Sequence, residues 1–91
     1  MDLPTIGNYG QGKTKRPNTI RISLSRITLY FSYQTLVAFS GPSGLTVRRN
    51  IWGPTTGKHL AWIDGGSVEA KAQRLPDSEF EAAFETACKH V

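Results

Sequence analysis

The segment 7–14 contains the residues whose spacing most resembles a known chemical motif. It reads GNYGQGKT and matches the phosphate-loop pattern G-x-x-x-x-G-K-[ST] at every fixed position. Such a loop binds phosphate because a strand leads into it and a helix leaves it, so that free amide groups at the helix start face the phosphate. Here Pro4 stands shortly before the segment, and Pro17 with a strand-like run follows it. The flanks do not support a nucleotide-hydrolysing loop, and we interpret the segment as glycine-rich connecting chain.

The histidines and the cysteine do not form a metal or acid–base group. His59 and His90 are the only histidines, and Cys88 is the only cysteine. On a helix, Cys88 and His90 would point about 200° apart, so they do not converge on one ion. Lys58, His59 and Asp64 have the types of an acid–base group, but no nucleophile or second carboxylate accompanies them. We therefore expect no catalytic residue, no metal and no cofactor, and we predict that the protein is not an enzyme.

Aromatic side chains interleave with basic ones in the middle of the sequence. Flat rings stack on nucleobases and cationic groups pair with phosphates, so this mixture is typical of surfaces that bind nucleic acids or nucleotides. A capped turn at a helix start would add amide groups that suit a phosphate. Alternatively, the tryptophans belong to the hydrophobic core. We predict a ligand-binding site made of Arg48, Arg49, Trp52, Thr55, Thr56, Lys58 and His59.

Charge is distributed unevenly along the sequence. The formal net charge is +4, but residues 1–58 hold eight basic residues against one acidic residue, a balance of +7. Residues 59–91 hold three basic residues against six acidic ones, a balance of −3. The basic part favours a polyanionic partner, whereas the simpler alternative is a basic sheet and an acidic helix face that only keep the protein soluble.

Length and composition predict one small domain. A chain of 91 residues buries only a little over ~60% of its unfolded surface, so its stability margin is thin and a homo-oligomer is expected. The single cysteine, the absence of a signal-peptide pattern and the absence of a long apolar run predict a soluble protein of the reducing cytoplasm without a membrane partner. We expect a flexible Gly/Lys-rich arm over 1–18 and a single α+β domain over 19–91.

Alternation of apolar and polar residues predicts an antiparallel β-meander of about four to five strands. A period-two run over 20–24 and a run of opposite phase over 27–33 place a turn or strong bend at 25–26. Gly-Pro-Ser-Gly at 41–44 separates two further β-branched runs, which indicates a hairpin. The run 68–72 alternates between apolar and polar residues and predicts an edge strand.

Two segments predict helices. Thr55 or Thr56 would cap a short helix near 56–63. Ser78 and Glu81 form a capping box at the start of a C-terminal helix. The apolar residues of that second helix recur at helical spacing, so we expect it to pack on the sheet.

Three stretches resemble a family of small uncharacterised proteins encoded by phages and plasmids. They are IGNYG at 6–10, the SYxTxVAF pattern at 32–39 and the TTGKHLxWI pattern at 55–63. The resemblance implies a mobile-element context and transfers no catalytic role. Small phage accessory proteins often act on host defence or regulation by binding, and this expectation rests on analogy alone.

Together these observations predict a small non-enzymatic accessory protein of a phage or mobile element in the cytoplasm of its host. It would bind an anionic partner, either a nucleic acid or a nucleotide signal, and one form of this function counters a host defence system. The alternative is a protein–protein inhibitor of a host enzyme or nuclease complex, of the anti-CRISPR kind, and a small hydrolase is a third hypothesis. The leading prediction requires one continuous basic surface that is separate from the acidic helix.

Overall fold

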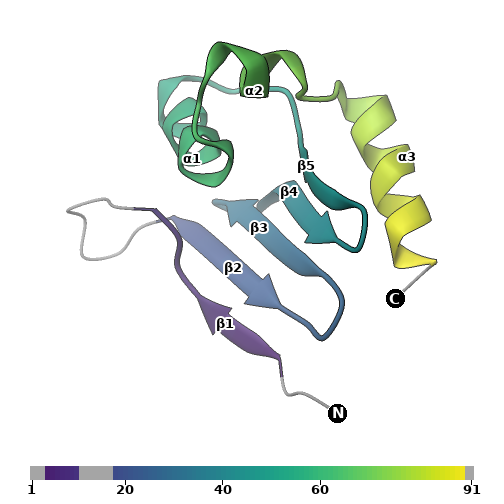
Figure 1. Cartoon of the computed structure of the whole chain (residues 1–91). Helices are drawn as coiled ribbons and strands as arrows, with labels where there is room; N and C mark the ends of the chain where they lie inside the picture. Colours follow the sequence, from purple (N-terminus) through teal and green to yellow (C-terminus); the bar gives the residue numbers. More distant parts are fainter. Residues whose placement is uncertain (1–3, 11–17, 90–91) are drawn as a thin grey trace.

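A computed structural model describes residues 4–10 and 18–89, which form an antiparallel sheet and three helices (Figure 1). The strands are β1 (Thr5–Gly7), β2 (Thr19–Ser23), β3 (Thr28–Ser32), β4 (Thr35–Gly41) and β5 (Gly44–Val47). The helices are α1 (Pro54–Asp64), α2 (Val68–Ala72) and α3 (Asp77–Cys88), and none in this part of the chain is long and apolar enough to cross a bilayer. The strands are neighbours in chain order and pair antiparallel, so the predicted α+β meander with a C-terminal helix is confirmed.

Tight turns join the strands, two of them at 25–26 and 41–44 as predicted and a third at 33–34, where the sequence predicted no turn. The β2–β3 turn closes with the Leu24 N–H donating to the Ile27 carbonyl at 2.8 Å, which confirms the turn at 25–26. Tyr33 and Gln34 alone connect β3 to β4, and Tyr33 has a φ of 56°. Two-residue hairpin loops require positive φ, which glycine adopts freely and a tyrosine adopts only at a cost.

One face of the sheet packs against α3 through apolar side chains. Phe80 is fully buried, and its ring lies edge to face with Phe39 at a centroid distance of 5.5 Å. Phe84 lies 5.3 Å from the same ring. Burial of such side chains stabilises the fold by about 1.5–3 kcal/mol each. The apolar residues that recur at helical spacing form the face of α3 that packs on the sheet, as the sequence predicted.

The other face packs against α1. Val37, Ala38 and Val47 from the sheet surround Leu60 from the helix, and all four are buried. Beyond α1, a buried ion pair holds the next segment in place, because Arg74 donates to both carboxylate oxygens of Asp64 at 2.7 and 2.9 Å. The chain from α1 to the start of α3 is therefore anchored by both packing and charge.

The helix caps differ from the prediction. α1 takes Gly53 as its N-cap, so Thr55 and Thr56 lie inside its first turn and cap nothing. α3 takes Pro76 as its N-cap, so Ser78 lies inside the helix and no side chain caps this end. In both helices a proline fixes where the chain turns into the helix, ahead of the predicted hydroxyl cap.

The segment 68–72 is helix α2, so the predicted edge strand is wrong. The Ser67 hydroxyl accepts from the Ala70 N–H at 3.0 Å and caps this helix. Alternation over five residues is compatible with either structure, and alanine, glutamate and lysine have a stronger intrinsic preference for helix.

The N-terminal segment also differs from the prediction in its described part. β1 pairs with β2, and the Tyr9 side chain is buried, with its hydroxyl donating to the Phe31 carbonyl at 2.9 Å. A strand of three residues beside glycines has no detectable period, so sequence reasoning predicted a flexible arm instead. Residues 11–17, with the GKT of the phosphate-loop pattern and three of the basic residues, lie outside the described residues.

Candidate functional site

The neighbouring Arg48 and Arg49 lie in different surroundings. The Arg48 guanidinium donates to Asp77 of α3 at 3.0 Å, lies 3.8 Å from Glu81, and sits 4.3 Å from the ring centroid of Phe80. Its side chain is only 12% exposed, whereas Arg49 is exposed. Arg48 therefore serves the packing of α3, and the predicted separation of the basic surface from the acidic helix is wrong at this residue.

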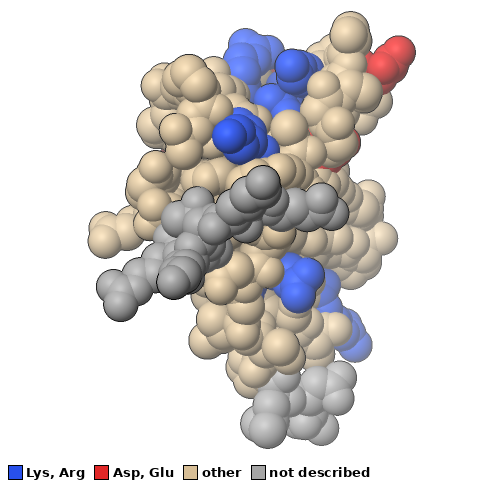
Figure 2. All heavy atoms as spheres, turned by 90° about the vertical axis from the view of Figure 1, so that its left-hand side faces the viewer, with Lys and Arg blue, Asp and Glu red and all other residues tan. Residues whose placement is uncertain are grey.

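The basic side chains of the described residues do not form one visible patch. On the face shown in Figure 2, the Lys and Arg of the described residues appear as an upper and a lower group. Arg74 is buried and held by Asp64. Burial alone would raise the pKa of Asp64, but hydrogen bonds from Arg74 and Gly66 outweigh burial and hold this pKa below its ordinary value. The described residues contain eight basic and six acidic residues, so they carry only +2 of the net +4.

His59 and Thr56 lie in the interior, where they connect α1 to the end of β3. The His59 Nδ1 lies 2.7 Å from the Ser32 hydroxyl, which in turn lies 3.3 Å from the Thr56 hydroxyl. These three side chains are 5%, 2% and 7% exposed. Because they are one helical turn apart, His59 and Thr56 reach the same point of the strand. Sequence reasoning missed Ser32, since its partners lie 24 and 27 residues away.

The Ser32–His59 pair has the composition of a nucleophile and its base. Burial lowers the pKa of His59 and the nearby Lys58 charge lowers it further, so the ring is neutral and its Nδ1 can accept the Ser32 proton. In the described chain, however, no carboxylate hydrogen-bonds this ring, and no group of three His, Cys, Asp or Glu side chains could hold a metal. Both side chains are interior, so the geometry fits a structural link between strand and helix.

An aromatic stack extends this link towards the N-terminal segment. The His59 ring is stacked on Trp62 with centroids 5.4 Å apart, and Tyr33 lies 5.9 Å from His59 on the hairpin. Trp62 also packs directly on Gly10, where an added Cβ would collide with the indole ring. Of the two tryptophans, Trp62 is therefore the one used in packing, whereas Trp52 is 43% exposed.

A cavity of about 250 Å³ lies between Tyr33 and Trp52, next to the Ser32–His59 link. Both rings are about half exposed, at 49% and 43%. The other residues that line the cavity are Ser32, Thr35, Val37 and Thr56. Its wall thus combines flat rings with three hydroxyl groups and one apolar side chain, a mixture that is typical of small-ligand sites.

The start of α1 adjoins this cavity through Thr56. The Gly53 N-cap has no side chain, and no side chain caps the first turn, so the positive end of the helix dipole lacks a built-in partner among the described residues. The Asn50 side-chain oxygen accepts from the N–H groups of Trp52 and Gly53 at 3.0 and 3.3 Å. This turn fixes the loop that carries Trp52, with the exposed Lys58 one turn further along the helix.

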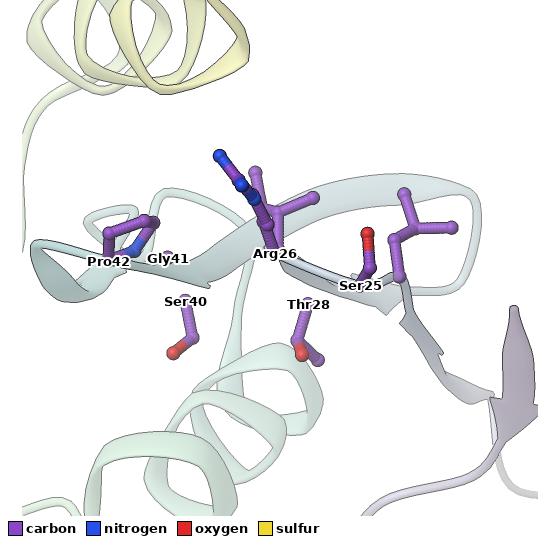
Figure 3. Close-up of a pocket in the computed structure, with 8 residues that line it drawn as sticks. Ser25, Arg26, Thr28, Ser40, Gly41 and Pro42 are labelled. Carbon is purple, nitrogen blue, oxygen red and sulfur yellow. The ribbon is translucent and has the colours of Figure 1, made fainter. Parts of the chain in front are cut away.

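A second cavity, of about 500 Å³, lies at the opposite end of β3, beside the β2–β3 and β4–β5 turns. Figure 3 shows Arg26 pointing to the α3 side of the sheet, whereas Thr28 and Ser40 point to the other side. Because its polar side chains do not converge, this cavity is a weaker ligand site than the cavity between Tyr33 and Trp52.

Comparison with known proteins gives one match. A model of a family of unknown function, DUF8033, matches residues 1–82. The chain belongs to DUF8033. No curated protein and no solved structure matches it. Membership in DUF8033 agrees with the predicted resemblance to an uncharacterised family, and the family description assigns no activity.

In this DUF8033 protein, the seven predicted site residues fall into three groups. Trp52 and Thr56 line the cavity, and His59 lies beneath it, next to Ser32. Arg49, Thr55 and Lys58 are exposed in the same stretch of chain but do not line the cavity. Arg48 belongs to the α3 side. Tyr33 was missed, although an aromatic residue in a two-residue turn between strong strand patterns is an unusual choice that could have identified it.

Proposed function

We propose that this protein is a non-enzymatic binding protein whose ligand is anionic and carries a flat ring, such as a nucleotide or an unpaired base of a nucleic acid. The observation that carries the proposal is the cavity of about 250 Å³ between the half-exposed rings of Tyr33 and Trp52. Exposed aromatic rings beside a cavity with hydroxyl groups suit a ring that stacks and hydrogen-bonds at its edge.

Each part of the ligand would meet a different group of residues. The ring stacks on Trp52 or Tyr33, and stacking on an aromatic side chain contributes about 1–3 kcal/mol per base. Of the three hydroxyl groups in the cavity wall, those of Ser32 and Thr56 take part in the link to His59, so that of Thr35 is the one offered to the edge of the ring. The uncapped first turn of α1 and the exposed charge of Lys58 favour a phosphate.

The backbone of Tyr33 supports the same assignment. Its φ of 56° is a conformation that non-glycine residues adopt at a cost, and such residues concentrate at binding sites. A glycine would satisfy this turn without cost but would remove one ring from the cavity. Contact between the Tyr33 ring and a ligand would therefore explain why a tyrosine occupies this position.

The biological setting of the proposal comes from the sequence resemblance. We place the protein among accessory proteins of phages or plasmids that act in the host cytoplasm, where binding a nucleotide signal or a nucleic acid would counter host defence. This setting predicts that the ligand is present in an infected or plasmid-bearing cell. It does not alter the chemistry expected at the cavity.

The test is a titration of the protein with single-stranded oligonucleotides and with mono- and cyclic nucleotides at two salt concentrations, followed by tryptophan fluorescence. We expect binding to weaken as the salt concentration rises, because contacts of the phosphates with Lys58 and Arg49 release the counterions that surround the free ligand. Replacing Trp52 by leucine should weaken the affinity by about fivefold to 150-fold, the equivalent of 1–3 kcal/mol, when binding is followed by calorimetry.

A matched pair of charge variants separates a specific site from general attraction. Lys58→Ala and Lys89→Ala remove the same charge, but Lys89 lies at the end of α3 on the other side of the sheet. We expect only Lys58→Ala to weaken binding strongly. The same variant should reduce the slope of log affinity against log salt concentration by about one. Equal effects of the two variants, or no binding of any ligand, would contradict the proposal. The alternative is then an inhibitor whose protein-binding surface includes the exposed Ile51.

A further inference from the structure

The β3–β4 hairpin borders two cavities that share a wall. Next to the cavity between Tyr33 and Trp52 lies a cavity of about 520 Å³, the hairpin cavity, which is lined by Asn18, Ile20, Tyr33, Gln34 and Thr35. Tyr33 and Thr35 line both cavities, and every residue around either of them belongs to the described part of the chain. The two cavities therefore adjoin, and a ligand held in the first has room to continue into the hairpin cavity.

The walls of the hairpin cavity have groups that suit a second flat ring. Tyr33 contributes an aromatic side chain that is 49% exposed, and Ile20 adds an apolar side chain that is 39% exposed. Asn18 and Gln34 are exposed, and the amide group of each side chain both donates and accepts hydrogen bonds. A nucleobase combines a flat face that stacks with an edge of donors and acceptors that amide groups can pair with.

Backbone and side-chain contacts hold the shared wall in place. The Tyr33 N–H donates to the Asn18 carbonyl at 2.7 Å, and Ser32 pairs with Thr35 across the hairpin. The His59 ring lies 5.9 Å from the Tyr33 ring and is itself held by the Ser32 hydroxyl at 2.7 Å. A wall that is ordered before the ligand arrives loses little conformational entropy on binding. The Tyr33 ring can then contact a flat group in each of the two cavities.

The absence of charge in the walls indicates how two such rings would be joined. None of the described residues that line the two cavities is charged. A chain of several phosphates would therefore lack charged partners there, and burying an unpaired charge is costly. A phosphodiester joins two nucleosides with a single negative charge, so it fits these neutral walls better than a polyphosphate does.

We propose that the ligand contains two nucleosides joined by a phosphodiester, with one base in the cavity between Tyr33 and Trp52 and the other in the hairpin cavity. This inference rests on the proposed function and narrows its ligand class, because a mononucleotide would leave the hairpin cavity empty. Linear dinucleotides, cyclic dinucleotides and single strands of nucleic acid all contain this unit.

Calorimetry of the full chain with a matched pair of ligands tests the proposal. One ligand is the dinucleoside monophosphate of adenosine, and the other is an analogue in which the second sugar carries no base. We expect the second base to raise the affinity by about fivefold to 150-fold, the range that one stacked base contributes. The two ligands have the same charge, so counterion release cannot produce this difference.

Two results would separate this proposal from the proposed function. Equal affinities of the two ligands would overturn the two-base ligand but leave the proposed binding of a single base standing. Binding of neither ligand, nor of any mononucleotide, would contradict both.

The variant Gln34→Ala locates the second base. Gln34 lines the hairpin cavity alone, so this change should lower the affinity for the two-base ligand by about twofold to tenfold and leave the one-base analogue unaffected. Gln73→Ala is the matched control, because Gln73 is exposed at the end of α2. Trp52→Leu should weaken both ligands. If Gln34→Ala and Ile20→Ala both left the two-base ligand bound as in wild type, the second base would lie elsewhere and the proposal would be wrong.

Two further ligands identify the source of the two-base unit. A cyclic dinucleotide that binds more tightly than the linear one would support a nucleotide signal. An affinity that rises further with the length of a single-stranded oligonucleotide would support nucleic acid.

Discussion

The two faces of the sheet are held by different kinds of interaction. On the α3 face, Phe39, Phe80 and Phe84 pack in an apolar cluster. On the α1 face, Ser32 and His59 form a buried hydrogen-bonded link beside the apolar contacts of Leu60. The first kind depends on area and shape, whereas the second depends on the direction of particular donors and acceptors.

The difference indicates that one face contributes mainly to the stability of the fold and the other mainly to the orientation of particular side chains. Apolar packing contributes most of the folding free energy but specifies orientation loosely. A satisfied polar link contributes less and fixes orientation more strictly, which is what the cavity between Tyr33 and Trp52 requires. The α1 face therefore has the properties of a binding face, and the α3 face has those of a structural support. Each prediction below tests this division.

The largest effect is expected on the α3 face. Phe80→Ala should lower the free energy of unfolding by about 3–5 kcal/mol, because it removes a fully buried ring and leaves a cavity. Urea denaturation measures the loss, with Leu45→Ala as a control at a position that is 45% exposed. A loss below about 1 kcal/mol would show that the α3 face is not the main support.

A smaller effect is expected on the α1 face. Ser32→Ala should lower the free energy of unfolding by about 1–3 kcal/mol, since the buried His59 ring loses its partner at Nδ1. Ser43→Ala, in the exposed β4–β5 turn, should change it by less than about 0.5 kcal/mol. If Ser32→Ala cost as much as Phe80→Ala in the same urea experiment, the proposed division between the faces would be wrong.

Substitution of Tyr33 should lower ligand affinity without lowering the free energy of unfolding. Tyr33→Gly should leave the free energy of unfolding unchanged or raise it by up to about 1 kcal/mol, because glycine relieves the positive φ, while ligand affinity falls. Gln34→Gly, at the next position with an ordinary φ, should instead destabilise by about 0.5–1 kcal/mol. Equal losses of stability in both variants would argue against a tyrosine retained for binding.

The smallest effect is a pH dependence that arises on the α1 face. Burial and Lys58 lower the pKa of His59 from its ordinary 6.5, so the unfolded chain binds this proton more readily than the folded chain. The stability associated with neutral His59 is present above that ordinary value and is lost as pH falls through the lowered pKa. Urea midpoints measured from neutral to mildly acidic pH should show this loss in wild type, and a flatter profile in His59→Gln.

Local patterns predicted most of the secondary structure, because each pattern depends on neighbours within a few residues. The turn at 25–26, the hairpin at 41–44 and the helix near 56–63 all agree with the structure. The errors fall where the pattern is short, as at 68–72 and in β1. Five alternating residues or a three-residue strand contain too little information to distinguish one structure from another.

The candidate site was predicted less well, because it depends on contacts between distant residues. Clustered residue types drew attention to the start of α1, where Trp52 and Thr56 line the proposed ligand cavity. Sequence spacing could not show that Arg48 pairs with Asp77, or that His59 is buried against Ser32. Each of those contacts joins residues more than 20 positions apart.

The sequence by itself determined the α+β class, the turn at 25–26, the hairpin at 41–44 and the apolar face of α3, since hydrophobic periodicity and turn residues act locally. Tertiary structure decided which charges stay available, which aromatic rings are exposed, and which part of the sheet α3 leaves uncovered. Those properties depend on which surfaces meet, and the free energy of burying or pairing a side chain is set by neighbours that only the folded chain brings together.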